Sequence, residues 1–171
     1  MESHLRRKSI AVLAGLLLLA CASGWAQEKA APSDSLVIKS ESKSVTFSVA
    51  EFHALPHLSL TVHNAHTDTT ESYSGVPLAV LLQKVNAPLG KELRGKAMTN
   101  YVVATGSDGY AVVLSLAEID PELHQGQVIV ADQQGGNAIG KDGPFRLVVS
   151  DDKRPARWVR NLVAIAVKGA Q

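Results

Sequence analysis

Residues 145 to 167 read "FRLVVSDDKRPARWVRNLVAIAV" and contain two apolar runs that are separated by a charged loop. The runs "FRLVVS" (145–150) and "LVAIAV" (162–167) are rich in β-branched residues, which predicts two strands apolar enough to lie at the centre of a sheet. Five cationic side chains lie between residues 146 and 160. The stretch therefore predicts a sheet-rich fold and raises the question of what these cations bind.

Further strand-like runs lie N-terminal to this stretch. Residues 101–116, "YVVATGSDGYAVVLSL", form two strand-like arms around "GSDG" (106–109), and the glycines of this turn can adopt positive φ. This pattern predicts a hairpin. The runs "SVTF" (44–47) and "QVIVAD" (127–132) predict further strands.

Three short helices are predicted from their starts. "SVAE" (48–51) and "SLAE" (115–118) have the spacing of a capping box, in which a serine accepts from the third amide and a glutamate reaches back. In "VPLAVLLQKV" (76–85) Pro77 stands near a first turn and the apolar residues follow a helical period, with Gly75 as the turn into the helix. We therefore predict one α+β domain with a mostly β core and a few short helices.

The first residues have the features of a secretory signal peptide. A basic start (6–8), an apolar run (9–22) and small residues at 24–27 predict export to the periplasm or secretion, with cleavage after Ala26. Residues 1–26 are assigned to this signal peptide and 27–35 to a flexible lead-in. A lipoprotein anchored at Cys21 is the alternative, and no later run is long enough to predict a membrane span.

Removal of the predicted signal peptide leaves a nearly neutral domain without cysteine. Residues 1–26 hold three of the 17 basic and one of the 16 acidic residues, so a net charge near −1 remains and no nucleic-acid partner is implied. Cys21 is the only cysteine of the sequence. The predicted domain therefore has no disulfide, thiolate metal ligand or cysteine nucleophile.

Five segments in order resemble the oxidoreductase molybdopterin-binding domain of the sulfite oxidase type. They are "YSGVPLAVLL" (73–82), "SDGYAVVLSLAEID" (107–120), "VIVAD" (128–132), "GPFRLVV" (143–149) and "RWVRNLVAIAV" (157–167). The resemblance spans residues 36–168 and is that of a small, stand-alone member of the family. It implies a mixed α+β fold with a mostly β core, in agreement with the prediction from caps and turns.

The resemblance also implies a cofactor site, although an incomplete one. In the family a cysteine ligates molybdenum, and Arg, Lys and His side chains hold the pyranopterin and its phosphate. The family's R-x-V-K element resembles "RWVR", which places Arg157 and Arg160 at the cofactor, and Arg146 is added as a residue that lines the pocket. The cysteine has no counterpart, so molybdopterin is a possible but doubtful ligand and molybdenum is not expected.

The charged loop also has an ordinary explanation. Asp151 and Asp152 stand beside Lys153 and Arg154, so pairing at the surface accounts for part of the cluster. If residues 157–160 are extended, the two arginines at its ends lie on opposite faces, and binding of one shared phosphate requires a bend. Trp158 is expected to be a core or rim aromatic.

The histidines form a second group of interest. His53 and His57 are four residues apart, but Pro56 discourages a helix that would place them on one face. His63 and His66 lie three apart near a polar loop over 64–72. Neither pair has the spacing of a zinc motif, so surface histidines and no metal site are predicted.

Three functions follow from these observations. The leading hypothesis is a non-catalytic or catalytically reduced module that binds a small anion or a pterin through Arg146, Arg157 and Arg160, with no catalytic residue assigned. The alternative is a periplasmic molybdopterin-dependent oxidoreductase that works with a redox partner protein, so the sequence leaves open whether the chain is an enzyme. Periplasmic metal binding through residues 53–68 is a second alternative, tested at His63 and His66.

Overall fold

Two five-stranded sheets form the body of the molecule, which is a computed structural model that describes residues 34–170. The predicted signal peptide and Cys21 lie outside the described residues. The strands are β1 (Ser35–Lys39), β2 (Ser44–Ser48), β3 (Leu58–Asn64), β4 (Thr69–Pro77), β5 (Asn100–Gly106), β6 (Ala111–Ser115), β7 (Val128–Gln134), β8 (Asn137–Ala138), β9 (Arg146–Val149) and β10 (Leu162–Gly169). The helical segments are α1 (Val49–His53), α2 (Leu78–Gln83), α3 (Leu116–Ile119) and the 3-10 turns η1 (Gly90–Glu92), η2 (Gly95–Thr99) and η3 (Pro155–Arg157).

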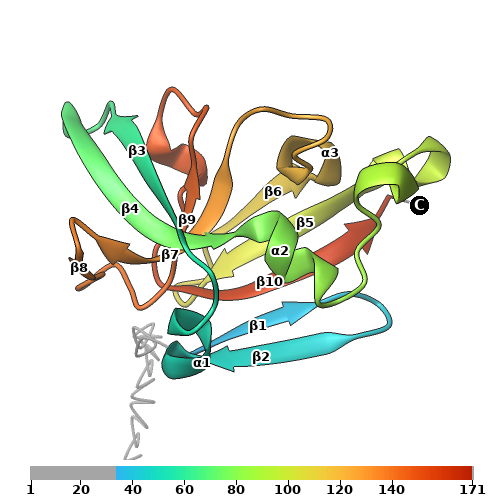
Figure 1. Ribbon diagram of the computed structural model, residues 1–171, viewed down its shortest axis with the longest axis horizontal. Helices are drawn as coiled ribbons and strands as arrows, with labels where there is room; N and C mark the ends of the chain where they lie inside the picture. Colours follow the sequence, from blue (N-terminus) through green and yellow to red (C-terminus); the bar gives the residue numbers. More distant parts are fainter. Residues whose placement is uncertain (1–33, 171) are drawn as a thin grey trace, which may run out of the picture.

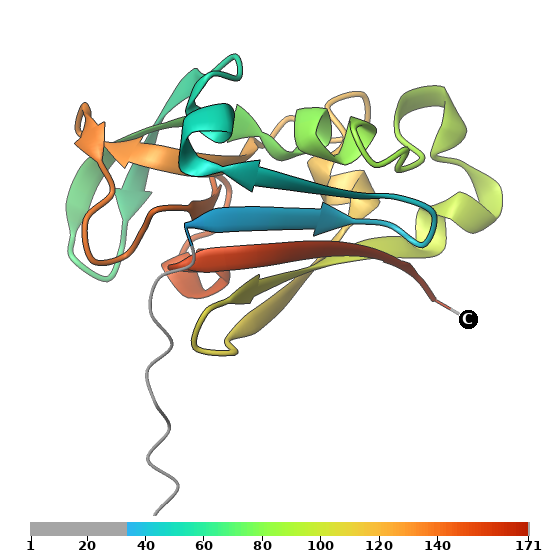
Figure 2. The ribbon, with the colours of Figure 1, turned by 90° about the horizontal axis from the view of Figure 1, so that it is seen from below.

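The first sheet has the strand order β2-β1-β10-β5-β6. β1 pairs with β10 in parallel, and the other neighbours are antiparallel. Figure 2 shows β2, β1 and β10 side by side. The central position predicted for the apolar run 162–167 is therefore confirmed, as is the hairpin of β5 and β6.

The second sheet has the order β3-β4-β7-β8, and β9 pairs with β7 (Figure 1). The central position predicted for the run 145–150 is wrong, because β7 is the one strand among residues 34–170 with which β9 pairs. Its residues are nevertheless buried, since the chain after η3 covers its outer edge: the Leu147 amide donates to the Val159 carbonyl over 2.9 Å. An apolar run indicates that a strand is buried, but its edge can be covered by a loop as well as by another strand.

Both capping boxes form as predicted. The Ser48 hydroxyl accepts from the Glu51 amide while the Glu51 carboxylate accepts from the Ser48 amide, and Ser115 and Glu118 repeat the arrangement at α3. The third predicted helix is α2, with Pro77 as its N-cap. All three predicted helices are thus confirmed, because their start signals depend on neighbouring residues alone.

Gly75 does not form the turn that the sequence predicted. It lies inside β4, which begins at Thr69 and so shortens the predicted loop 64–72 to a tight connection. A Cβ at residue 75 would lie 2.2 Å from the Val130 carbonyl oxygen of β7. The glycine is therefore required for the close approach of two strands.

The core is one apolar cluster that draws on both sheets. It contains Leu36 and Ile38 from β1, Ile165 from β10 and Ile129 from β7, and all four are fully buried. Among residues 34–170, no helix has the length and apolar character needed to cross a bilayer.

Candidate functional site

An open cavity of about 890 Å³ lies where several loops meet beside the second sheet. The β3–β4 and β5–β6 turns, the segment before β9 and the loop around η3 form its wall. Cationic side chains gather here from distant parts of the sequence; they are Lys141, Arg146, Arg154 and Arg160. Loops carried on a rigid sheet are a common place for a ligand site.

Arg146 lines this cavity from inside the fold and is only 8% exposed. Its guanidinium carbon lies 5.4 Å from the centre of the Tyr73 ring and 5.8 Å from that of Trp158. The Nη1 atom approaches the Asp142 carboxylate at 3.4 Å, whereas the buried Nε has no hydrogen-bond partner among residues 34–170. Arg146 is therefore a largely desolvated cation that packs against two aromatic rings.

Beneath Arg146, Tyr73 and Glu71 form a polar pair. The Tyr73 hydroxyl donates to Glu71 Oε2 over 2.5 Å. Burial and this carboxylate raise the pKa of Tyr73 well above its ordinary value. Burial opposes ionisation of Glu71, but hydrogen bonds from Tyr73, Asn64 and Thr69 among others outweigh it and lower the pKa of Glu71. The pair thus presents one negative charge beside the Arg146 cation.

Arg160 lies at the rim of the same cavity. Its side chain is 64% exposed, and its Nη1 lies 3.7 Å from Asp142, the carboxylate that Arg146 also approaches. The backbone around it is anchored, because the Asn161 amide donates to the Asp142 carbonyl over 2.7 Å. The structure therefore brings together two of the three arginines that were predicted to bind a ligand, Arg146 and Arg160.

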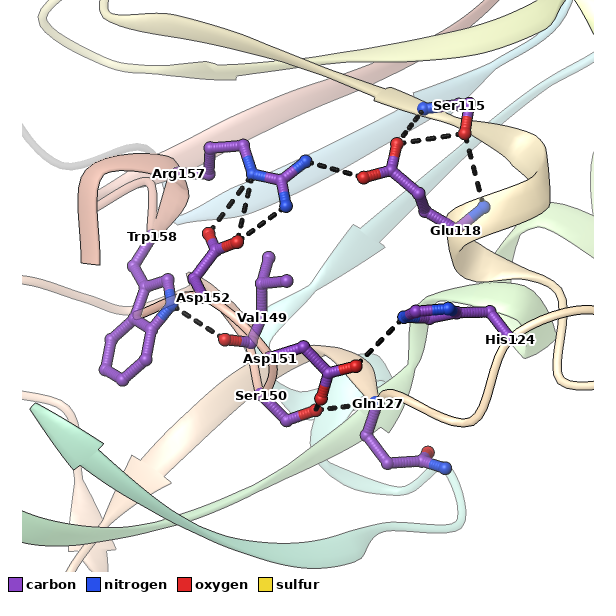
Figure 3. Close-up of polar contacts among 10 residues, drawn as sticks. All are labelled: Ser115, Glu118, His124, Gln127, Val149, Ser150, Asp151, Asp152, Arg157 and Trp158. Carbon is purple, nitrogen blue, oxygen red and sulfur yellow. Dashed lines mark hydrogen bonds and ion pairs between the residues drawn. The ribbon is translucent and has the colours of Figure 1, made fainter. Parts of the chain in front are cut away.

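Arg157 lies apart from them. Its guanidinium donates to Asp152 from Nε and Nη2, the latter over 2.6 Å, and from Nη1 to Glu118 over 2.8 Å (Figure 3). These carboxylates raise the pKa of Arg157 despite partial burial. It is not among the residues that line the cavity. The turn η3 followed by extended chain makes Arg157 and Arg160 diverge.

The loop charges pair differently from the sequence expectation. Asp152 pairs with Arg157, and Asp151 lies 3.0 Å from His124 (Figure 3). Local pairing with Lys153 and Arg154 was expected, but Asp152 pairs with Arg157 of η3 and Asp151 contacts His124 in the segment before β7. Arg154 is thereby left at the cavity wall.

Two aromatic residues hold this loop in place. Trp158 is buried and its indole donates to the Val149 carbonyl over 2.9 Å, which confirms the predicted core aromatic (Figure 3). The Tyr110 hydroxyl donates to the Ala156 carbonyl over 2.6 Å, so Tyr110 joins the β5–β6 turn to the cavity edge. Asp108 accepts from the Tyr110 amide, as a turn former does.

The histidines that the sequence pairs are distributed differently in space. His63 lies 3.5 Å from the exposed Asp68, whereas His66 lines the cavity. His53 and His57 meet on one carboxylate, that of Asp132 in β7. The prediction of scattered surface histidines therefore misses this buried carboxylate, and nothing in the local sequence links Asp132 to residues 53 and 57.

Sequence reasoning also missed part of the cavity. Lys141 and Asp142 lie in the glycine-rich stretch 132–144, in which no site residue was predicted from the sequence, and Arg154 was expected to pair locally. The glycines at 135, 136, 140 and 143 were the available signal, because loops of this composition often border ligands.

No protein-family model matches the sequence, and no curated protein matches it. The structure is similar to that of the sulfane dehydrogenase SoxCD from Paracoccus pantotrophus, with a TM-score of 0.61 and 18% sequence identity. The similarity covers 81% of this chain and 39% of the SoxCD chain, so this chain spans less than half the length of that protein. Similarity at this identity establishes the fold alone. The α+β fold of the sulfite-oxidase type that the sequence predicted is confirmed.

The described residues fit a molybdopterin only in part. The cations of the cavity wall suit an anionic group such as a phosphate. A thiolate ligand for the metal has no source among residues 34–170, since the sole cysteine is residue 21. The cavity thus matches the anionic part of such a ligand and does not match thiolate ligation of molybdenum.

Proposed function

We propose that this chain is a molybdopterin-oxidoreductase-like domain that works as a binding module for a small ligand with a phosphate or similar anionic group. The observation that carries the proposal is Arg146, a nearly buried cation that lines a cavity of about 890 Å³. A buried cation is costly to keep away from water unless opposite charge accompanies it, so an anionic group in this cavity would stabilise the Arg146 guanidinium.

The other cations of the wall support an anionic ligand. Lys141, Arg154 and Arg160 are exposed and reach the cavity from two different loops. The carboxylates of Glu71, Asp108 and Asp142 in the same wall offset part of this charge, and Asp142 lies near both Arg146 and Arg160. A phosphate that binds both guanidiniums would form charge-assisted hydrogen bonds, which are stronger than neutral ones.

Thermal unfolding in the presence of pyrophosphate tests the proposal. Pyrophosphate should raise the Tm of the wild-type protein, because a ligand at about 100 times its Kd adds about 2.7 kcal/mol to the stability of the native state. Arg146→Met and Arg160→Gln should reduce this shift. Methionine at 146 retains an unbranched side chain for packing and removes the unsatisfied donor, which favours folding.

Arg157→Gln is the matched control. It should lower the Tm of the free protein, because it breaks the ion pairs to Asp152 and Glu118, and it should leave the pyrophosphate shift in place. Failure of both pyrophosphate and a pterin phosphate to shift the wild-type Tm would contradict the proposal.

Mass spectrometry and metal analysis of the protein purified from its native source test whether it is a binding module or an oxidoreductase. We expect an organic anion without stoichiometric molybdenum. Stoichiometric molybdenum with oxidoreductase turnover would instead support the enzyme.

Export is part of the proposal and rests on the sequence of residues 1–26 alone. We propose that the chain reaches the periplasm or the exterior and is cut after Ala26. A mature N-terminus at Gln27 is the expected result, and a lipid on Cys21 would show the anchored form instead.

A further inference from the structure

His53, His57 and Asp132 form a cluster on the side of the second sheet that faces α1. His53 is the last residue of α1, His57 lies in the connection to β3, and Asp132 lies in β7. His53 Nδ1 is 2.9 Å from Asp132 Oδ2, and His57 Nε2 is 3.0 Å from Asp132 Oδ1. None of the three lines the cavity described above. The cluster is therefore independent of the proposed anion site.

The hydrogen bond on the far side of His57 defines its tautomer. His57 Nδ1 lies 2.6 Å from the Leu55 carbonyl oxygen, which can only accept, so Nδ1 carries the hydrogen. In the neutral ring Nε2 then has a lone pair, and this lone pair faces a carboxylate oxygen of Asp132. Two such atoms at 3.0 Å repel each other unless a proton lies between them or a metal ion binds to both from one side.

Three features favour the metal ion. A histidine that ligates a metal commonly donates its other N–H to a backbone carbonyl, as His57 does to Leu55. The three donor atoms lie within 4.8 Å of one another. Neighbouring ligands of tetrahedral zinc lie about 3.3 Å apart, given Zn–N bonds of about 2.0 to 2.1 Å, and each of the two N···O distances is close to this value. The two distances end on different oxygens of Asp132, so one metal ion would bind the carboxylate through both oxygens or would require one imidazole to shift.

Two of the three side chains are largely buried, whereas the third is exposed and can change its orientation. The Asp132 side chain is 4% exposed and that of His57 is 15% exposed. The Phe52 ring packs edge-on against the His57 imidazole with centroids 5.9 Å apart. His53 is 60% exposed, so its ring can reorient, and the outer side of the site stays open to a water or another ligand.

We propose that His53 Nδ1, His57 Nε2 and the Asp132 carboxylate bind a divalent transition metal, with zinc as the probe and copper as the other ion that two imidazoles and a carboxylate suit. The metal would link the α1–β3 connection to β7. His63 and His66, the pair at which the sequence suggested a test, take no part.

Calorimetric titration of the chelator-treated, tag-free full chain with zinc chloride tests this site. The wild type should bind one zinc ion per chain. His53→Ala, which removes an exposed side chain and so leaves folding intact, should weaken binding at least about 10-fold. Asp132→Asn and His57→Gln should weaken it about 100-fold or abolish it, with circular dichroism to confirm that they are folded.

The matched control is the double variant His63→Ala with His66→Ala, which should bind zinc within about twofold of the wild type. Absence of saturable zinc binding to the wild type would overturn the proposal and leave a protonated His57 paired with Asp132. Unchanged affinity in His53→Ala, or loss of binding in the double variant, would also overturn it. Cobalt substitution provides a readout beside affinity, because tetrahedral N/O ligation gives visible absorption bands that His53→Ala should alter.

Discussion

Arg146 and Arg157 carry the same guanidinium group, and their surroundings give them different roles. Arg157 has its donors engaged by Asp152 and Glu118, so it fastens the η3 loop to α3. Arg146 is enclosed by two aromatic rings and keeps a free Nε. The sequence predicted both as cations that bind a ligand. It could not separate them, because the partners of Arg157 include a residue 39 positions away.

The pKa of Glu118 allows the ion pair between Glu118 and Arg157 to be tested. Burial alone would raise this pKa, but hydrogen bonds from Arg157 and Ser115 outweigh it and hold the pKa of Glu118 below its ordinary value of 4.5. A carboxyl whose pKa is lowered by folding stabilises the native state above its unfolded pKa, and the contribution is lost as pH falls through the folded pKa.

Glu118→Gln should therefore lower the free energy of unfolding by about 1 kcal/mol at neutral pH, since the side chain is partly exposed. Glutamine retains the capping box, so the charge is the main change. Urea unfolding between about pH 7 and pH 3 should show the difference vanish in acid. Glu92→Gln, at an exposed position, is the control and should show little effect. An equal difference at every pH would contradict this explanation.

Elements with local signals were predictable, and elements with distant partners were not. Both capping boxes lie within four residues of sequence and form as expected. The N-terminal half of β4 and the edge position of β9 were missed. Strand neighbours depend on pairing between segments far apart in the chain, and residue alternation reports only which face is buried.

Gly75 is the residue on which the pairing of β4 with β7 depends. Gly75→Ala should cost about 3 kcal/mol or more, because the added Cβ would meet the Val130 carbonyl oxygen and the Ala131 Cα, both of them backbone atoms. Thermal or urea unfolding measures the loss.

Gly140→Ala is the matched control, since a Cβ there meets nothing within 4 Å. It should change stability by less than about 0.5 kcal/mol. Equal stability of the two variants would show that β4 can move away from β7 at little cost.

At the scale of the whole molecule, one core joins the two sheets. Its apolar cluster contains β1 residues such as Ile38 and second-sheet residues such as Ile129 and Leu147. β1 also pairs with β10 in parallel, so the first strand closes against the last. A single shared core predicts that neither sheet unfolds alone.

Ile38→Ala tests this coupling. Ile38 is fully buried, so the cavity left by the change should lower the free energy of unfolding by about 3 kcal/mol. In the chain that begins at Gln27, Trp158 is the single tryptophan and reports on the second sheet. Its fluorescence and far-ultraviolet circular dichroism should give the same midpoint in urea, for both wild type and variant. Separate midpoints for the two signals would show that the sheets unfold independently.

The sequence by itself determined the α+β class, the helix starts, the β5–β6 hairpin and the lack of cysteine between residues 34 and 170. These features depend on residues that are neighbours in the chain or on composition alone. The tertiary structure decided which cations share a cavity, and it brought His53 and His57 to Asp132 across 79 and 75 positions of sequence. Such contacts between distant residues follow from how the sheets pack, and no local pattern of residues encodes that packing.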